Sequence, residues 1–233
     1  MSAIIKAQGL KKSYGKKVVL DNVSFEIEEG SIVGLLGPNG CGKTTLIKIL
    51  TGLIKDHTGT VKIANEEPGA YTKGLVAFLP DTSYLPDWMK PTDAIEYFAD
   101  FYEDFDKNKA VRMVTDFGLD PHQKFKTMSK GQQEKLSLIL VMCRRAKLYI
   151  LDEPLGGLDP AARSAILDLI MTNYADNATV LISTHLISDV ERIFNRVLMI
   201  SQGKLIVNSH VDELREKGKT VDEVFKEVFS YAW

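Results

Sequence analysis

The sequence predicts an α/β fold with a mainly parallel sheet, because short apolar runs typical of strands alternate with segments of helical spacing. Residues 37–44 read Gly-Pro-Asn-Gly-Cys-Gly-Lys-Thr, a phosphate-binding pattern that requires a strand before it and a helix after it. A buried strand, 148–151, delivers the adjacent carboxylates of Asp152 and Glu153 at its carboxyl end. Ligand crevices form at such strand ends in open α/β sheets.

The first sixty residues are dominated by short strands and turns. β-Prone runs cover 18–20, 23–27 and 32–36. The polar pairs Asp21-Asn22 and Glu29-Gly30 are expected to separate these runs as turns.

The phosphate-binding pattern lies between the strand 32–36 and a helix-like segment, 44–50. Its glycines let backbone N–H groups approach phosphate oxygens, and the helix N-terminus adds partial positive charge. Lys43 is expected to reach the terminal phosphates and the Thr44 hydroxyl to ligate magnesium. An incidental glycine turn is disfavoured by the flanking strand and helix, so we predict a nucleoside triphosphate site. Its expected members are Gly37, Pro38, Asn39, Gly40, Cys41, Gly42, Lys43, Thr44 and Thr45.

The middle of the chain changes character at Pro91. Strands are expected to begin at 61–63 and to cover 75–79, whereas helical spacing follows. The amphipathic helix predicted there carries an acidic face and an aromatic stripe, which is either a core surface or a docking surface for a partner. The stripe consists of Ile95, Phe98, Phe101, Tyr102 and Phe105.

The second half alternates between helices and strands. The apolar runs 148–151 and 180–182 are both typical of strands buried on both faces. Helices are expected at about 134–145, at 161–174 and at 220–233, the last with one apolar face.

Composition is that of an ordinary soluble globular protein. The apolar content is 45% and the net charge is −2, which argues against a nucleic-acid partner. Cys41 and Cys143 indicate no disulfide framework, and a cysteine inside a phosphate loop fits a reducing cytosol. The sequence shows neither a signal peptide nor an apolar run of about 18 residues. If the protein works at a membrane, another chain is expected to cross it.

The two adjacent carboxylates can take different roles, because successive strand residues point to opposite sides. Asp152 is expected to hold the magnesium shell through water, and Glu153 to polarise the attacking water as general base. An acidic pair at a strand end can also be purely structural. The phosphate loop in the same chain favours the catalytic interpretation.

Two further motifs indicate a family. Met-Ser-Lys-Gly-Gln-Gln at 128–133 precedes a predicted helix, and His185 closes an Ile-Ser-Thr-His segment after a strand. Gly-Gly-Leu-Asp at 156–159 follows the carboxylate pair. In this order, over roughly residues 1–215, the motifs resemble those of the ATPase subunit of an ATP-binding cassette (ABC) transporter.

The resemblance implies a phosphate-loop NTPase core with an N-terminal antiparallel β subdomain and an inserted helical subdomain. Within a single domain, 1–233, residues 1–80 and 146–215 would form the nucleotide-binding core. The helical signature subdomain would cover about 82–145, and a C-terminal amphipathic helix about 216–233.

The resemblance also assigns roles residue by residue. Tyr14 matches an aromatic residue that stacks on adenine, although a tyrosine in a turn often only packs. Ser129, Gly131 and Gln132 match the signature that contacts the γ-phosphate of ATP held by the opposite subunit. Ser129 alone would be interpreted as a helix N-cap. Asp159 matches a loop that communicates across the dimer.

The resemblance places His185 at the γ-phosphate, whereas a lone histidine at a strand end is usually structural. The predicted catalytic residues are Glu153, His185 and Lys43, and the predicted metal ligands are Thr44, Asp152 and Asp81.

The sequence departs from the family pattern at two positions. Lys130 stands where many members have a signature glycine, and members with export partners often carry such a variant. Asp81 stands where the family usually has a glutamine that touches magnesium and the attacking water and senses the membrane partner. An ionised aspartate can accept from water and bind metal, but it cannot donate a hydrogen bond. The alternative for Asp81 is a turn residue that caps a backbone N–H.

The resemblance implies an ATPase that uses ATP and magnesium, as a homodimer or as a heterodimer with a paralogous cassette. It would drive a separate transmembrane permease in the direction of export, from the cytoplasmic face of the cell membrane. Three alternatives come from other classes: a soluble translation or repair cassette, a non-hydrolysing regulatory cassette, and a phosphate-loop kinase or GTPase. The first usually has two cassettes or a long coiled-coil insertion, the second would lack Glu153 or His185, and the third would lack the signature.

Overall fold

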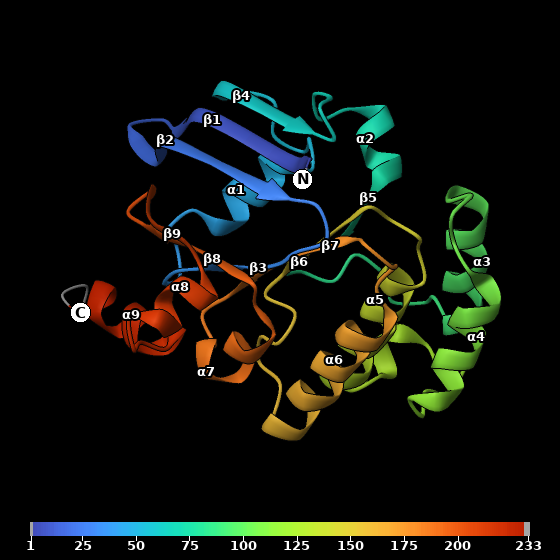
Figure 1. Cartoon of the computed structure of the whole chain (residues 1–233). Helices are drawn as coiled ribbons and strands as arrows, with labels where there is room; N and C mark the ends of the chain where they lie inside the picture. Colours follow the sequence, from blue (N-terminus) through green and yellow to red (C-terminus); the bar gives the residue numbers. More distant parts are fainter. Residues whose placement is uncertain (1, 231–233) are drawn as a thin grey trace.

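The computed structural model describes residues 2–230 and divides the strands between two sheets. The smaller sheet is antiparallel, in the order β2-β1-β4 (Figure 1). Its strands are β1 (Ala3–Tyr14), β2 (Lys17–Glu28) and β4 (Thr58–Ile63). The larger sheet has the order β5-β6-β7-β3-β8-β9, and only β9 runs antiparallel to its neighbour. Its strands are β3 (Ile32–Leu36), β5 (Val76–Leu79), β6 (Leu148–Asp152), β7 (Thr179–Thr184), β8 (Arg196–Ser201) and β9 (Lys204–His210).

Helices cover both faces of the larger sheet, which explains its apolar strands. Every residue of β3, β6 and β7 is buried, as parallel strands covered on both faces require. The edge strand β9 instead alternates between exposed and half-buried residues. The helices are α1 (Lys43–Leu50), α2 (Ala70–Leu75), α3 (Pro91–Phe101), α4 (Lys107–Asp116), α5 (Lys130–Met142), α6 (Pro160–Asn173), α7 (Ile187–Val190), α8 (Val211–Glu216) and α9 (Val221–Phe229).

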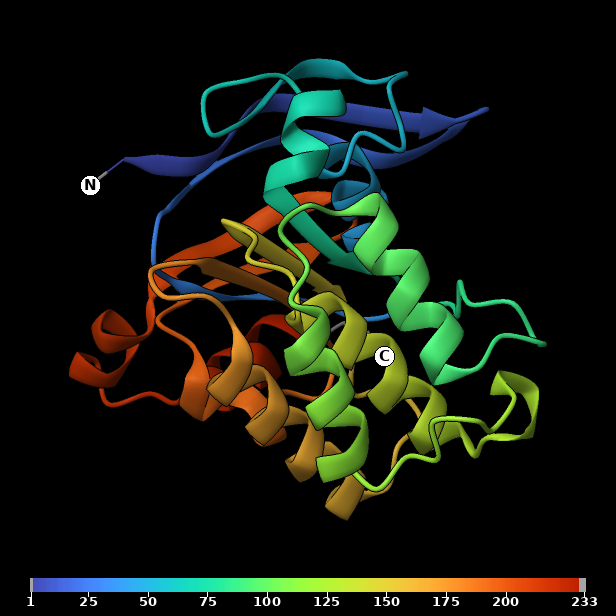
Figure 2. The same ribbon diagram turned by 90° about the vertical axis from the view of Figure 1, so that its right-hand side faces the viewer.

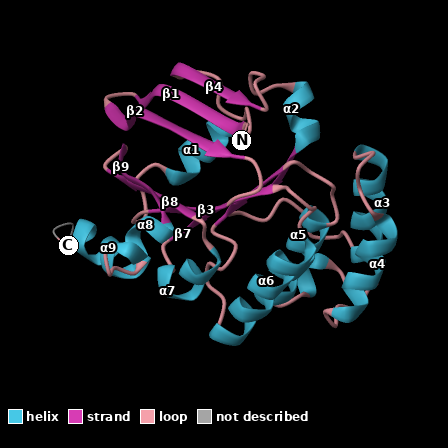
Figure 3. Ribbon diagram, viewed as in Figure 1, coloured by secondary structure: helices cyan, strands magenta, loops and turns pink. Residues whose placement is uncertain are grey.

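The molecule has two apolar cores, one on each face of the larger sheet. Helix α1 lies between the two sheets, and Leu46 and Ile47 pack there with Leu35 of β3 (Figures 1 and 3). On the opposite face, Leu36 and Leu151 pack beneath α5 and α6. Alternate residues of one strand therefore serve different cores.

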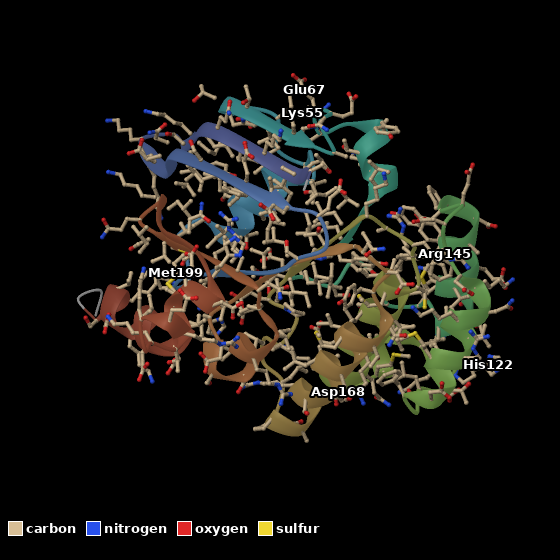
Figure 4. The ribbon with its side chains drawn as sticks, in the orientation of Figure 1. Lys55, Glu67, His122, Arg145, Asp168 and Met199 are labelled. Carbon is tan, nitrogen blue, oxygen red and sulfur yellow. The ribbon has the colours of Figure 1, made fainter. Side chains whose placement is uncertain are left out.

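Three of the residues labelled in Figure 4 illustrate this arrangement. Asp168 on α6 and His122 beyond α4 lie on the outer surface, and both are exposed. Met199 of β8 is fully buried in the core on the helical face of the sheet.

Helices α3, α4 and α5 form a layer beside the larger sheet (Figure 2). Arg144, just after α5, joins this layer to β5. Its guanidinium donates to the carbonyls of Val76 and Gly74, each at 2.7 Å, and forms an ion pair with Asp104 at 3.0 Å. The guanidinium also lies 3.9 Å from the centroid of the Tyr102 ring. These contacts fix where the helical layer meets the sheet.

Several predicted boundaries were wrong in the N-terminal half. The runs 18–20 and 23–27 belong to one strand, β2, and no turn separates them at Asp21-Asn22. Asn22 instead adopts a left-handed φ of +57° where the β1–β2 pairing is irregular. A local bulge can absorb such a residue without ending the strand. Helix α2 was not expected, and it shortens the predicted strand 75–79 at its start.

The predicted helical segments also need correction. Helix α5 begins at Lys130 rather than near 134, and it ends at Met142 rather than 145. The aromatic helix ends at Phe101, so Phe105 lies outside it and pairs with Arg144 in an isolated β-bridge. Phe98 is buried, whereas Phe101 is 67% exposed, so the stripe does not lie on one buried face. The last helix covers Val221–Phe229, and residues 231–233 of the predicted 220–233 lie outside the described residues.

Within residues 2–230, no helix combines the length and the apolar character needed to cross a membrane.

Candidate nucleotide-binding site

The phosphate loop joins β3 to α1 and is packed tightly between other elements. Gly42 has a φ of +116°, and a Cβ there would lie 2.8 Å from the Val19 carbonyl oxygen of β2. At Gly37, a Cβ would lie 2.4 Å from the Ile200 carbonyl oxygen of β8. Both distances are too short for a side chain, so glycine is required at these two positions for space as well as conformation. The loop is therefore fixed in shape by neighbouring strands.

Lys43, the first residue of α1, directs its ammonium back into the loop. Its Nζ donates to the Gly37 carbonyl at 2.8 Å and lies 3.2 Å from Glu153 Oε1. The Lys43 side chain is only 6% exposed. A buried ammonium with several donors is suited to binding phosphate oxygens.

Glu153 lies directly after β6 and faces two cationic or titratable groups. Its Oε2 lies 2.9 Å from His185 Nδ1, and its Oε1 lies 3.2 Å from Lys43 Nζ. Oε1 is buried and accepts no hydrogen bond from the described residues, so it is a polar atom that a water or substrate group could satisfy. The structure thus brings Lys43, Glu153 and His185 together from three separate elements.

Asp152 ends β6 and is buried, with 2% exposure. Burial raises the pKa of its carboxyl above the usual range, and hydrogen bonds from Ser183 and Thr44 oppose that rise. The nearby negative charges of Asp81 and Glu153 raise the pKa further. Asp152 and Thr44 thus supply neighbouring oxygen ligands of the kind that magnesium prefers.

Thr44 and Asp152 supply one hydroxyl and one carboxylate oxygen to a metal ion. No group of three or more His, Cys, Asp or Glu side chains in residues 2–230 could hold a metal ion alone. Magnesium commonly takes only one or two protein carboxylates and completes its shell with waters and substrate phosphates. Thr44 and Asp152 would therefore suffice as protein ligands only when a phosphate group is also bound.

Asp81 lies beside this region but is exposed to solvent. The chain bends at residues 81 and 82 without a hydrogen-bonded turn. Asp81, Thr44 and Asp152 all line one groove with a volume of about 720 Å³. The carboxylate of Asp81 can therefore influence the oxygen ligands through charge across this groove.

The signature segment is separate from the phosphate loop of its own chain. Ser129 is the N-cap of α5: its hydroxyl accepts from the Gln132 N–H at 3.3 Å, and the Gln132 side chain accepts from the Ser129 N–H at 2.8 Å. No hydrogen bond or ion pair in the described part of the chain joins Ser129, Gly131 or Gln132 to the loop. The N-cap interpretation and a role toward another subunit are therefore compatible.

The signature instead contacts the loop that follows Glu153. A Cβ built on Gly157 would lie 2.1 Å from Lys130 Nζ, so the lysine side chain extends across that glycine. Gly131 faces Leu158 of the same loop. Asp159 ends the loop as the N-cap of α6 and accepts from the Ala162 N–H at 2.9 Å. The two segments expected to face a second subunit are thus neighbours.

Tyr14 lies at the end of β1 and is 50% exposed. The ammonium of Lys12 lies 4.7 Å from its ring centroid and pairs with Asp56. The following strand, β2, packs against Gly42 of the phosphate loop through Val19. An exposed aromatic ring in the hairpin next to the loop is available for stacking.

Sequence reasoning missed Ser183, which the structure places at the centre of the site. Ser183 is fully buried and pairs with Asp152 across the β6–β7 register. The only sequence indication of its role was its position two residues before His185. Recognising that role requires the register between β6 and β7, which are far apart in sequence.

Comparison with known proteins assigns the family. The sequence model of the family described as ABC transporter matches residues 20–156. The chain belongs to the ABC transporter family. The predicted family is thereby confirmed, and the protein is an ABC ATPase, because members of this family hydrolyse ATP to power transport.

Curated relatives match this ABC ATPase over most of its length. The uncharacterized ABC transporter ATP-binding protein MJ1023 of Methanocaldococcus jannaschii is 33% identical over 224 residues, which are 93% of this chain and 81% of the relative. The SkfA peptide export ATP-binding protein SkfE of Bacillus subtilis is 32% identical over 96% of both chains. The lantibiotic transport ATP-binding protein SrtF of Streptococcus pyogenes is 30% identical over 90% of this chain and 92% of its own.

Solved structures confirm the predicted fold class of the ABC ATPase. The structure described as the ATP binding subunit of an ABC transporter has a TM-score of 0.85 and 27% identity, and it covers 96% of this chain and 98% of its own. A nucleotide-free ATP-binding cassette has a TM-score of 0.77 at 21% identity, which shows the fold alone. The chain is therefore the ATP-binding subunit of an ABC transporter.

Proposed function

We propose that this subunit hydrolyses ATP with magnesium in a closed dimer and drives a separate permease that exports its substrate. The observation that carries the proposal is the cluster in which Glu153 lies 3.2 Å from Lys43 and 2.9 Å from His185 at the edge of the sheet. Each side chain in that cluster has a distinct role in phosphoryl transfer to water.

Glu153 is the residue we assign as general base. Its buried Oε1 can accept a proton from the attacking water, whose oxygen bonds to the γ-phosphorus while the bond to the β–γ bridging oxygen breaks. The products are ADP and phosphate. Lys43 and His185 donate to the γ-phosphate oxygens, where negative charge accumulates. The His185 side chain is 39% exposed, so it can contact a nucleotide bound at the phosphate loop of the same chain.

Magnesium fits the oxygen ligands Thr44 and Asp152, and it would neutralise charge on the bridging phosphates when bound. We include Asp81 as a ligand of its water shell, because it lines the same groove. Asp152 is held by Ser183 and Thr44, so its carboxylate keeps one orientation. We therefore assign these residues to holding the metal and the phosphates of the substrate.

A second cassette, identical or paralogous, would complete each site. Ser129 at the N-terminus of α5 and the cap residue Asp159 are both exposed. Neither contacts the phosphate loop of its own chain through a hydrogen bond or ion pair among the described residues. A helix N-terminus favours anions. We therefore assign Ser129, Gly131 and Gln132 to the γ-phosphate bound by the partner, and Tyr14 to the adenine of the chain's own nucleotide.

The permease is proposed to dock in the groove beside α3, which would place the subunit at the cytoplasmic face of the membrane. Tyr97 and Phe101 are 49% and 67% exposed, and their ring centroids lie 4.6 Å apart at the rim of the groove. Leu53 and Tyr71 add exposed apolar area, with 57% and 67% exposure. Export is supported by the names of SkfE and SrtF, which belong to peptide export and lantibiotic transport.

Replacing Phe101 with Ser is expected to abolish coupling to the permease while leaving the ATPase rate of the isolated subunit within about twofold. An exposed side chain contributes little to the fold, whereas an aromatic residue at the centre of an interface commonly dominates binding. The measurement is binding to, and stimulation of the ATPase rate by, the permease that co-purifies with the wild-type subunit. Val111→Ser on α4, 51% exposed and outside the groove, is the matched control. Equal loss in both variants, or loss in neither, would contradict docking at this groove.

Replacing Asp81 with Asn is expected to reduce magnesium-dependent hydrolysis and to improve ATP binding without metal. Removing one negative charge near the phosphates relieves a repulsion that, after screening, should change the metal-free Kd by about fivefold. Calorimetry in EDTA and a steady-state ATPase assay measure the two effects. Asp87→Asn, an exposed carboxylate in the same loop, is the control. No change in either quantity would overturn the role of Asp81 in the metal shell.

A further inference from the structure

We propose that Ser183 is a positioning residue of the ATPase site, joining the carboxylate of Asp152 to the backbone of Glu153. The inference rests on the proposed roles of those two residues. Its hydroxyl would hold the metal-binding carboxylate and the general base in one fixed relation and would act through these two residues.

The hydroxyl of Ser183 makes two hydrogen bonds inside the sheet. It donates to Asp152 Oδ1 at 2.5 Å and accepts from the Glu153 N–H at 3.0 Å. The Ser183 carbonyl also accepts from that N–H, at 3.1 Å. Ser183 is fully buried, so no water competes for these bonds. One side chain therefore connects both adjacent carboxylate residues.

The Glu153 backbone needs such support because its φ is +50°. This left-handed conformation is unfavourable for a residue with a Cβ and persists only where the surroundings fix it. Ser183 holds the Glu153 N–H, while the Glu153 carbonyl accepts from the Gly156 N–H at 3.0 Å. The turn directs the carboxylate away from the strand, toward Lys43 and His185.

The Ser183 hydroxyl matters more than the Ser183 carbonyl because only the hydroxyl donates to Asp152. In Ser183→Ala, the Glu153 N–H still has the carbonyl as acceptor, but Asp152 loses its strongest fixed donor among the described residues. Partners of this kind orient metal ligands, and removing them typically costs about 10- to 100-fold in metal affinity or activity. The defect should therefore appear in magnesium dependence rather than in nucleotide binding.

The test compares three variants by calorimetry and by hydrolysis across a magnesium titration. Ser183→Ala is expected to lower kcat by about 10-fold or more, to raise the magnesium concentration for half-maximal rate, and to weaken Mg-ATP binding. Metal-free ATP affinity should stay unchanged. Ser183→Thr keeps the hydroxyl and should recover most of the rate. Thr179→Val is the matched control, because Thr179 is an equally buried hydroxyl on the same strand that bonds Gly30 N and Glu28 O instead.

The outcomes separate a positioning role from a structural one. If Ser183→Ala and Thr179→Val lose activity in proportion to melting temperature, with magnesium dependence unchanged, the proposal is overturned. Should Ser183→Ala not fold, Ser183→Cys keeps the side-chain volume with a weaker donor, and the same magnesium shift is required of it. A wild-type rate in Glu153→Gln would instead refute the proposed general base. A shift in magnesium dependence in Ser183→Ala would even then support the role of Ser183 in orienting Asp152.

Discussion

Glu153→Gln is expected to bind ATP with wild-type affinity and to hydrolyse it about 10² to 10⁴ times more slowly, the usual cost of losing a catalytic base. The amide keeps the size of the side chain but accepts a proton poorly. Oε1 of Glu153 is buried and accepts no hydrogen bond within residues 2–230, so it is free to accept one from a water molecule. Single-turnover hydrolysis and equilibrium ATP binding measure the two quantities separately.

The same variant should also dimerise when ATP is added, since a closed dimer can form but cannot discharge its nucleotide. Light scattering with and without ATP tests this directly. Glu191→Gln is a suitable control, because Glu191 is a partly buried carboxylate that accepts from the Asp222 N–H at 3.1 Å, outside the site. Wild-type-like turnover in Glu153→Gln would remove the general-base assignment, and a persistent monomer would remove the proposed closed dimer.

The parts of the fold that could be predicted from the sequence are those with strong local signals. Strands β3, β6 and β7 are buried throughout and carry apolar runs because helices cover both faces of the sheet, and the phosphate-loop helix follows its glycines directly. The continuity of β2 was missed because Asp21-Asn22 resembles a turn, whereas β1 pairs along both sides of that bulge. Tertiary pairing outweighed local preference there.

The candidate site divides in the same way. Lys43, Asp152 and Glu153 were predicted because each lies in a short motif whose chemistry is visible in the sequence. Ser183 was not, because its role depends on the parallel register of β6 and β7. The contact between Lys130 and Gly157 likewise joins residues with no sequence signal for their proximity. Such pairings follow from the fold and not from any single segment.

Lys43→Ala is expected to weaken ATP binding itself, in contrast to the change at Glu153. The Lys43 side chain is 6% exposed and its ammonium donates to the Gly37 carbonyl of the loop, so its removal deletes a buried, charge-assisted contact to phosphate. Hydrogen bonds to charged groups contribute about 1.5–3 kcal/mol, which corresponds to roughly a tenfold or greater rise in Kd. Calorimetry with ATP measures the rise, and Lys48→Ala on the exposed side of the same helix is the control.

Loss of Lys43 also leaves Glu153 without its ammonium partner, so a folding defect must be separated from a binding defect. Lys43→Met, which retains side-chain volume, should show the same loss of affinity at wild-type melting temperature. Unchanged ATP affinity in both variants, with the Lys48→Ala control also unchanged, would contradict the phosphate-loop assignment.

Mixing variants extends this prediction to the partner subunit. Gly131→Asp should fold, because a Cβ at Gly131 meets no atom closer than 3.9 Å, but its charge would repel the γ-phosphate held by the opposite copy. Lys43→Ala and Gly131→Asp are each expected to be nearly inactive alone. In the mixed dimer, the intact phosphate loop of one copy faces the intact signature of the other, so one complete site is restored. ATPase activity in the mixture above the sum of the separate proteins is therefore expected; a strictly additive rate from folded, exchanging subunits would refute a site shared between two copies.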